Sequence, residues 1–267
     1  MRHEAQYGLL QDLVQTKSYS GEEGPILALI ESHLQEQGIH TLRQDSNLLV
    51  HFQGKNREKA LIFNGHVDTV SADEEAWSPV APFGSKAGKI FKGNMYGLGA
   101  SDMKSGVYTQ IKIAESIHSQ GEPPCDIWLV FVTEEETSGK GTSSFVDWFF
   151  SQKLGYSEIG VIIPEPTDLN KFFTGQRGNY ALRVQIKGDI GHASQPDAGM
   201  ENSILLMGEF LRNLQEKVEG WKTRYQDELF GPPTVSVTAI KGGDFIYPNK
   251  YFSRSLLSLN WSGFTKM

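Results

Sequence analysis

Two short apolar segments, each without regular polar alternation, most constrain how this chain folds. They read ALIFNG over residues 60–65 and DIWLVFVT over residues 126–133. Unbroken apolar runs of this length are typical of strands that are buried on both faces, as in parallel sheets. Apolar residues with helical spacing follow over 103–119 and 143–152. Because strands alternate with helices, we predict an α/β fold with a mostly parallel sheet flanked by helices.

The N-terminal part is predicted to contribute two helices. The first covers about 7–17, and the second covers about 25–37, where apolar residues recur with helical spacing. The segment SGEE at 20–23 has the pattern of a capping box before the second helix. In that interpretation Ser20 is the N-cap, and Glu23 bonds back to the start of the helix.

The pattern changes in the second half of the chain. Residues 180–187 alternate between apolar and polar, which predicts a strand with one solvated face. A helix over 201–218 and a strand over 234–240 are expected to follow. We therefore predict two domains, over 1–175 and 176–267, of which the second is a smaller α+β unit.

Composition excludes several classes of protein. The net charge of −7 argues against a nucleic-acid-binding surface. No apolar run reaches the roughly 18 residues of a membrane span, and the first residues lack the apolar core of a signal peptide. Cys125 is the single cysteine, which excludes an internal disulfide framework. We therefore expect a cytoplasmic protein without nucleic-acid or membrane partners.

Acidic residues and one histidine recur just past the predicted strands. The positions are His66 and Asp68, then Asp102, then Glu134-Glu135-Glu136, and finally Glu165 between two prolines. In open α/β sheets, ligands bind at the carboxyl ends of the strands. Because side chains two residues apart on a strand point to the same side, Asp68 is placed to orient the imidazole of His66.

Each of these positions taken alone also fits a plainer structural role. Taken alone, the H-x-D motif favours a polar loop after a strand, and Asp102 also fits an ordinary acidic residue near a helix N-cap. The three glutamates also fit a solvated charged face. Adjacent carboxylates repel unless a cation offsets their charge. The four positions in combination therefore favour a functional site.

The order of the motifs, H-x-D, G-x-x-D-x-K-x-G, E-E-E and P-E-P-T, resembles one family closely. It is similar to the zinc-dependent aminoacylase and carboxypeptidase family. That family includes acetylornithine deacetylase, succinyl-diaminopimelate desuccinylase, the lysine-biosynthesis deacylases and glutamate carboxypeptidase. The resemblance extends roughly from Leu9 to Asn249. It implies a zinc-exopeptidase-like, metal-binding catalytic domain over 1–175 and an incomplete lid and dimerisation domain over 176–267.

The resemblance implies a role for each strand-end residue. His66 resembles the histidine of a first metal site, and Asp68 resembles the aspartate that orients it. Asp102 resembles the carboxylate that bridges two metals, and Glu165 the remaining carboxylate on the first metal. Nitrogen and oxygen ligands suit Zn²⁺, so the resemblance implies one or two zinc ions, with Co²⁺ or Mn²⁺ as alternatives.

The triple glutamate fits the family motif in two registers. Aligned on Gly141, Glu135 is the general base and Glu136 is a ligand of the second metal. In the competing register, shifted by one residue, Glu134 is the base and Glu135 the ligand. In both registers the metals polarise an amide carbonyl and acidify a water, and the base passes that water's proton to the leaving nitrogen.

The second domain also resembles the lid of this family. In the segment GDIGHAS at 188–194, His192 resembles a histidine that reaches a substrate oxyanion. Arg177 and Asn202 resemble positions associated with the lid and the substrate carboxylate. The implied function is hydrolysis of the amide bond of N-acyl amino acids by a homodimer formed through the lid. Two alternatives stay open: a dipeptidase or carboxypeptidase with the same site, and a truncated non-catalytic remnant that binds metal or another subunit.

The resemblance ends near Asn249. Members of the family continue further and supply a late histidine to the second metal, whereas the last histidine of this chain is His192. We therefore expect a truncated or frameshifted product whose missing strands leave sheet edges without partners. The first metal site is complete in the sequence, and the second lacks one ligand. The expectation is a mononuclear or weak binuclear site with reduced activity.

Overall fold

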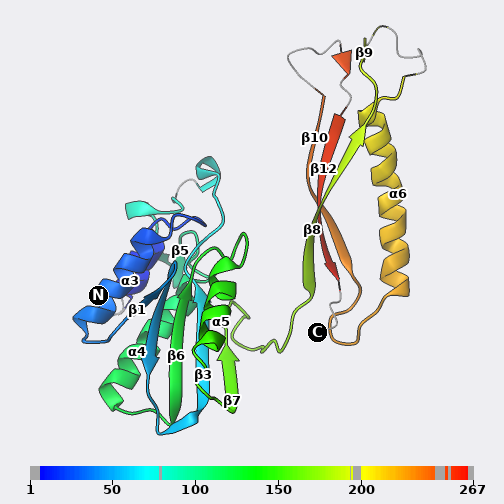
Figure 1. The fold of residues 1–267 in the computed structure, drawn as a ribbon. Coiled ribbons are helices and arrows are strands. Elements are labelled where there is room, and N and C mark those ends of the chain that lie inside the picture. Colours follow the sequence, from blue (N-terminus) through cyan, green and yellow to red (C-terminus); the bar gives the residue numbers. More distant parts are fainter. Residues whose placement is uncertain are drawn as a thin grey trace. The chain divides into compact units, whose positions relative to one another are not determined.

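The computed structural model describes residues 7–77, 80–192, 194, 200–243, 250–251 and 254–263. The chain forms two compact units, residues 1–171 and residues 172–267. Each unit has its own sheet, and Figure 1 shows the labelled helices and strands of both. Among the helices of the described residues, none combines the length and the apolar character that crossing a bilayer requires.

A five-stranded sheet lies at the centre of the first unit (Figure 1). Its order is β1-β2-β6-β3-β7, with the bounds β1 Leu42–Gln44, β2 Asn47–Phe52, β3 Asn56–His66, β6 Cys125–Val132 and β7 Glu158–Ile162. β3 pairs in parallel with β6 and β7, whereas β2 pairs antiparallel with β1 and β6. Within this sheet, β2 is therefore the one strand that is antiparallel to the others. The predicted α/β fold is confirmed, with a mixed sheet because β1 and β2 form a hairpin.

Helices cover both faces of this sheet. On one face lie α2 (Gly8–Gln15), α3 (Gly24–Glu36) and α4 (Lys104–Gln120), and on the other lies α5 (Lys140–Ser151). The side chains of β6 alternate between the two cores: Ile127, Leu129 and Phe131 belong to the first, and Trp128, Val130 and Val132 to the second. This double burial explains why β6 is apolar from Ile127 to Val132.

Helix α3 begins at Gly24, and the predicted capping box is wrong. Glu23 occupies the N-cap position, and no side chain caps the helix there. The side chains of Ser20 and Glu23 bond instead to residues far along the chain. The helix ends where expected, just before Gly38, which adopts the left-handed conformation at φ 78°.

The segment between β3 and α4 contains only short elements. They are the 3₁₀ helices η1 (Glu74–Trp77) and η2 (Gly84–Lys86) and the hairpin strands β4 (Lys89–Phe91) and β5 (Asn94–Tyr96). Two glutamine side chains of α2 hold this segment: Nε2 of Gln11 donates to the carbonyl of Gly88, and Nε2 of Gln15 to that of Ala87. These bonds tie the long loop to the N-terminal helix.

The second unit consists of a three-stranded antiparallel sheet and one long helix. The sheet order is β10-β12-β8, with the bounds β8 Gly178–Lys187, β10 Thr234–Gly242 and β12 Arg254–Gly263. Helix α6 (Ser203–Arg224) packs on the sheet, where Met207 is buried against Val184 and Ile186. Two short strands, β9 (Gly191–His192) and β11 (Lys250–Tyr251), pair with each other.

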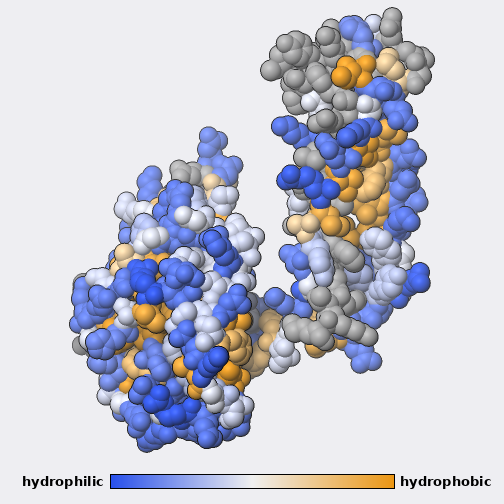
Figure 2. All heavy atoms as spheres, in the orientation of Figure 1, coloured by the Kyte–Doolittle hydropathy of each residue, from blue (hydrophilic) through white to orange (hydrophobic). Residues whose placement is uncertain are grey.

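Strand β12 was not predicted from the sequence. It lies between β8 and β10 and pairs with both, so β8 and β10 are the edge strands of this sheet. Figure 2 shows a broad hydrophobic area on the second unit. The exposed side chains of this unit include Leu182, Val237 and Ile240.

Candidate active site

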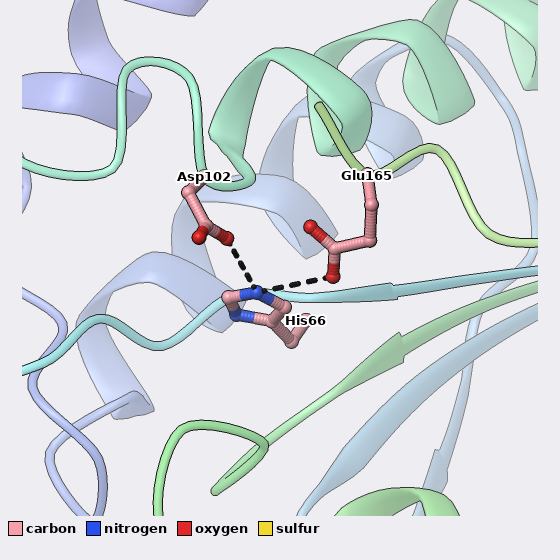
Figure 3. A group of neighbouring side chains, drawn as sticks. All are labelled: His66, Asp102 and Glu165. Atoms are coloured by element: carbon pink, nitrogen blue, oxygen red, sulfur yellow. Dashed lines mark hydrogen bonds and ion pairs between the residues drawn. The ribbon is translucent and has the colours of Figure 1, made fainter. Parts of the chain in front are cut away.

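His66, Asp102 and Glu165 come from three separate segments and converge at one edge of the five-stranded sheet (Figure 3). His66 is the last residue of β3, Asp102 lies just before α4, and Glu165 follows β7. Because β3 and β7 are parallel neighbours, their carboxyl ends deliver side chains to the same edge. One ligand atom from each residue lies within 4.8 Å of the other two.

The Nε2 atom of His66 faces both carboxylates. It lies 3.1 Å from Oδ1 of Asp102 and 3.4 Å from Oε1 of Glu165, and Figure 3 shows both acids directed toward the imidazole. The side chain of His66 is buried at 2% exposure, whereas that of Asp102 is 58% exposed. The cluster therefore has a buried imidazole at its base and carboxylates that reach solvent.

The other nitrogen of His66 is held by Asp68. Nδ1 lies 3.0 Å from the backbone carbonyl oxygen of Asp68 and 3.4 Å from its carboxylate Oδ1. Since a carbonyl oxygen only accepts hydrogen bonds, Nδ1 carries a proton and donates it. In the neutral imidazole the lone pair is then on Nε2, directed at Asp102 and Glu165. Metal-ligating histidines are typically held in this way by a group behind the ring.

The cluster favours a positive charge. Burial alone would lower the pKa of His66, but the hydrogen bonds and negative charges of Asp68 and Glu165 raise it to about 11. The proton on His66 thus balances the carboxylates around it. A divalent cation would occupy the same position, and one imidazole nitrogen with carboxylate oxygens is a donor set that Zn²⁺ binds. The residues therefore fit the metal that the sequence predicts.

A glycine allows the Glu165 segment to approach α4. Gly106, in the first turn of α4, lies so close to the backbone carbonyl of Pro164 that a Cβ atom would overlap it. Any side chain at position 106 would push the Pro164-Glu165 segment away from the Asp102 loop. Gly106, the last glycine of the G-x-x-D-x-K-x-G motif, therefore allows Glu165 to lie close to Asp102.

Asp68 is fully buried and connects His66 to the acidic turn after β6. Its Oδ2 accepts a hydrogen bond from Ser20 Oγ at 2.6 Å and from the backbone N–H of Glu136 at 3.1 Å. Its Oδ1 accepts from the backbone N–H of Glu135 at 3.1 Å. Burial alone would raise the pKa of Asp68, but these bonds and the one with His66 lower it.

The three glutamates after β6 differ in their surroundings. Oε2 of Glu135 lies 4.0 Å from Nε2 of His66. Burial and the negative charges of nearby carboxylates raise the pKa of Glu135, against the opposing charge of His66. Burial and the charge of Asp102 likewise raise the pKa of Glu136.

Glu134 has different neighbours. Its carboxylate lies 3.8 Å from Nζ of Lys140 and 3.4 Å from Oγ of Ser138, both on the segment that leads into α5. The backbone of Glu134 adopts a left-handed conformation at φ 55°, which turns the chain sharply at the end of β6. The turn thus directs neighbouring glutamates to different partners, and the carboxylate of Glu135 lies 4.0 Å from His66.

Three residues around the cluster were assigned no site role from the sequence. Ser20 bonds to Asp68, and Oε1 of Glu23 accepts the backbone N–H of Glu134 at 3.0 Å. Lys104 of the G-x-x-D-x-K-x-G motif is fully buried, and burial lowers its pKa to about 7. Its Nζ donates to the carbonyl oxygens of Leu13 and Thr16 at the end of α2.

The remaining predicted residues, Arg177, His192 and Asn202, belong to the second unit. Oδ1 of Asn202 caps α6 by accepting from the backbone N–H groups of Ile204 and Leu205. The guanidinium of Arg177 donates to the carbonyl oxygen of Phe230. Nδ1 of His192 lies 2.8 Å from Oγ of Ser194 and accepts the backbone N–H of that residue.

Comparison with known proteins relates the chain to one peptidase family. Residues 62–243 match the model of peptidase family M20/M25/M40. Succinyl-diaminopimelate desuccinylase 2 of Ruegeria sp. (strain TM1040) is 30% identical over 246 residues, which cover 88% of this chain and 60% of that protein. Acetylornithine deacetylase of Buchnera aphidicola subsp. Acyrthosiphon pisum (strain Tuc7) is 33% identical over 192 residues, covering 70% of this chain and 46% of that protein.

Solved structures share the fold. A metallo-carboxypeptidase of the M20 family from Sulfolobus solfataricus has a TM-score of 0.70 at 16% identity, covering 97% of this chain and 71% of that one. Human carnosine dipeptidase 1 has a TM-score of 0.67 at 17% identity, covering 100% of this chain and 71% of that one. The chain spans about half to three fifths of the two sequence relatives described above.

Proposed function

Because the chain belongs to peptidase family M20/M25/M40, we propose that it carries the site of a metal-dependent hydrolase that cleaves the amide bond of N-acyl amino acids. The convergence of His66, Asp102 and Glu165, with the carboxylate of Glu135 beside them, is the observation that carries this proposal. The two sequence relatives are named as a desuccinylase and a deacetylase, and both names describe removal of an acyl group.

The metal in this proposal is Zn²⁺, held by His66, Asp102 and Glu165, with Co²⁺ or Mn²⁺ as substitutes. A second ion would use Asp102 together with Glu136, whose raised pKa reflects burial and the nearby charge of Asp102. When bound, such an ion polarises the amide carbonyl and lowers the pKa of a water molecule. Asp68 orients the imidazole of His66 through Nδ1.

Glu135 is the general base in this proposal. Its partly buried carboxylate, with a pKa raised by burial, is suited to accept a proton and to release it again. It takes a proton from the attacking water, whose oxygen bonds to the amide carbon. It then gives that proton to the nitrogen as the carbon–nitrogen bond breaks. The products are a carboxylic acid and a free amino acid.

His192 of the second unit is proposed to donate a hydrogen bond to the substrate oxyanion. Nδ1 of His192 accepts the backbone N–H of Ser194, so the proton of the neutral imidazole is on Nε2, which makes Nε2 a donor. Arg177 and Asn202 are proposed to act near the substrate carboxylate. The proposal also includes a homodimer through the second unit, supported by its exposed apolar side chains, and a cytoplasmic location, supported by the single cysteine.

A substrate panel tests the proposed function. The purified chain is loaded with Zn²⁺, Co²⁺ or Mn²⁺ and incubated with N-acetyl and N-succinyl amino acids and with dipeptides, and free amine is measured. We expect metal-dependent release from the N-acyl amino acids that is lost in His66→Ala and kept in Glu122→Gln, a change at an exposed residue before β6. Hydrolysis of dipeptides alone would establish the dipeptidase instead. Metal binding without any hydrolysis would contradict the proposal and support a non-catalytic remnant.

A further inference from the structure

We propose that Glu23 is a positioning residue that holds the Glu134–Glu136 turn and, through it, the carboxylate of Glu135. This inference rests on the proposed function, in which Glu135 is the general base. Glu23 belongs to the N-terminal segment that precedes α3, and the sequence pattern around it predicts only a helix cap. The structure gives its carboxylate a different set of partners.

Glu23 is buried at 6% exposure, and one carboxylate oxygen serves two backbone donors. Oε1 accepts the N–H of Gly21 at 2.9 Å and the N–H of Glu134 at 3.0 Å. The first bond closes a local turn around the carboxylate. The second joins residues 111 positions apart and reaches the first residue of the acidic run.

Asp68 continues the same pattern along the turn. Its carboxylate accepts the N–H groups of Glu135 and Glu136, the next two residues. Each of the three consecutive amides of the acidic run therefore donates to a buried carboxylate. Ser20 Oγ, three residues before Glu23, donates to Asp68 as well. The N-terminal segment thus supports the turn directly through Glu23 and indirectly through Ser20 and Asp68.

The turn needs this support for two reasons. The residue that Glu23 holds, Glu134, has a left-handed backbone at φ 55°, a conformation that residues other than glycine seldom adopt. In addition, the adjacent carboxylates of the acidic run carry like charges that repel one another. A backbone that is not held by bonds to buried groups would relax by moving these charges apart. The carbonyl of Glu134 is held too, because it accepts the N–H groups of Ser138 and Gly139.

A merely structural role for Glu23 makes a different prediction from a positioning role. If Glu23 only anchors the N-terminal segment, its loss lowers the melting temperature and leaves the turnover of the folded protein unchanged. If it positions the turn, its loss lowers kcat in protein that is still folded. A shift of about 1 Å in a catalytic group costs on the order of a hundredfold in rate.

The test uses three variants of the full chain. Glu23→Met fills the same space without an acceptor, and Glu23→Gln keeps an acceptor oxygen. Glu22→Gln is the matched control, since Glu22 is 58% exposed and pairs with Lys17 at the surface. For each variant, kcat and KM are measured on the N-acyl amino acid that the wild-type chain hydrolyses best. Amide hydrogen exchange is followed by NMR at Glu134 and at Leu129, in the middle of β6.

We expect Glu23→Met to lower kcat by roughly tenfold to a hundredfold with little change in KM. In Glu23→Met the Glu134 amide exchanges faster, while Leu129 keeps its protection. Glu23→Gln should stay within about threefold of the wild-type kcat, and Glu22→Gln should match wild type. Unchanged kcat in folded Glu23→Met, or unchanged exchange at Glu134, would overturn the inference.

Two further outcomes are also decisive. If Glu23→Met does not fold, exchange in the wild-type chain decides: a Glu134 amide that exchanges as fast as the exposed Glu122 amide overturns the inference, and a protected one supports it. If the wild-type chain hydrolyses no substrate, the proposed function fails on its own account. The exchange of Glu134 in Glu23→Met then decides separately whether Glu23 holds the turn.

Discussion

The backbone N–H of Glu135 donates to Oδ1 of Asp68, and this same oxygen lies 3.4 Å from Nδ1 of His66. One buried carboxylate therefore contacts both the proposed metal ligand and the peptide group that carries the proposed base. Orientation of the imidazole and placement of the acidic turn are coupled through a single side chain.

Replacing Asp68 by asparagine tests this coupling. Asparagine has one acceptor oxygen where Asp68 uses two, so some of the donors Ser20 Oγ, Glu135 N–H and Glu136 N–H lose a partner. We expect about 1–3 kcal/mol lower stability and roughly 10–100-fold weaker metal affinity or activity. Urea unfolding, zinc titration and kcat/KM measure these effects. The control is Asp12→Asn at an exposed position of α2, and equal behaviour of the two variants would contradict the coupling.

The register of the triple glutamate is tested by a pair of adjacent changes. Glu135→Gln should lower kcat by about 10²–10⁴, because glutamine cannot accept the proton of the attacking water. Glu134→Gln should leave kcat close to wild type, because its carboxylate faces Lys140 and Ser138. Steady-state kinetics on one substrate compare the two. The reverse ranking would establish the competing register, with Glu134 as the base.

Metal binding is tested by replacing Glu165, the last of the three proposed ligands in the sequence. Glu165→Ala removes one of the three converging ligands, so we expect zinc affinity to fall at least about tenfold. Equilibrium dialysis of the purified chain measures the affinity and the number of ions bound. Asp168→Ala is the control, because this carboxylate lies nearby in sequence, is 84% exposed and pairs with Lys171. Equal zinc affinity in both variants would refute Glu165 as a ligand.

A pH-dependent prediction concerns the opposite end of β6. The hydroxyl of Tyr156 donates to Oδ2 of Asp126 at 2.6 Å and accepts from Nε1 of Trp128 at 3.2 Å. Burial, and then the hydrogen bond to Asp126, raise the pKa of Tyr156 to about 12. Because this pKa lies above the unfolded value of about 10, the protonated hydroxyl stabilises the fold fully below pH 10. That contribution is lost as the pH rises toward 12.

Tyr156→Phe removes this contribution. We expect the variant to be about 1 kcal/mol less stable than wild type at pH 8, with the difference shrinking between pH 10 and pH 12. Urea unfolding across this range measures it. Tyr96→Phe, at an exposed tyrosine of β5, serves as the control and should show no such trend. A stability difference that stays constant up to pH 12 would rule out the titration of Tyr156 as its source.

Much of the fold follows from local patterns in the sequence. The β6 segment is recognisable because successive residues, such as Trp128 and Leu129, pack into two different cores. Residues on both faces of the strand are therefore apolar. The positions of His66, Asp102 and Glu165 follow from the order of their motifs. Their convergence depends on the parallel pairing of β3 with β7, which the sequence only suggests.

Other features depend on partners that no local pattern reveals. Ser20 and Glu23 satisfy the capping-box pattern, yet their partners lie 48 and 111 residues away, at Asp68 and Glu134. Helix α3 itself begins at Gly24, one residue from the expected start, with Glu23 at the N-cap position. Similarly, β12 is the central strand of the second sheet because it pairs with β8 and β10. The local spacing of apolar residues does not predict pairing between segments that are far apart in the sequence.

The backbone N–H groups of the acidic turn after β6 are not available to bind a substrate. The peptide N–H groups of Glu134, Glu135 and Glu136 all donate to the side chains of Glu23 and Asp68. Hydrolases often use such main-chain donors to stabilise negative charge that builds up on the scissile carbonyl oxygen. Here these three donors hold the turn, so in the proposed hydrolase this charge is met by groups other than the amides of the acidic run.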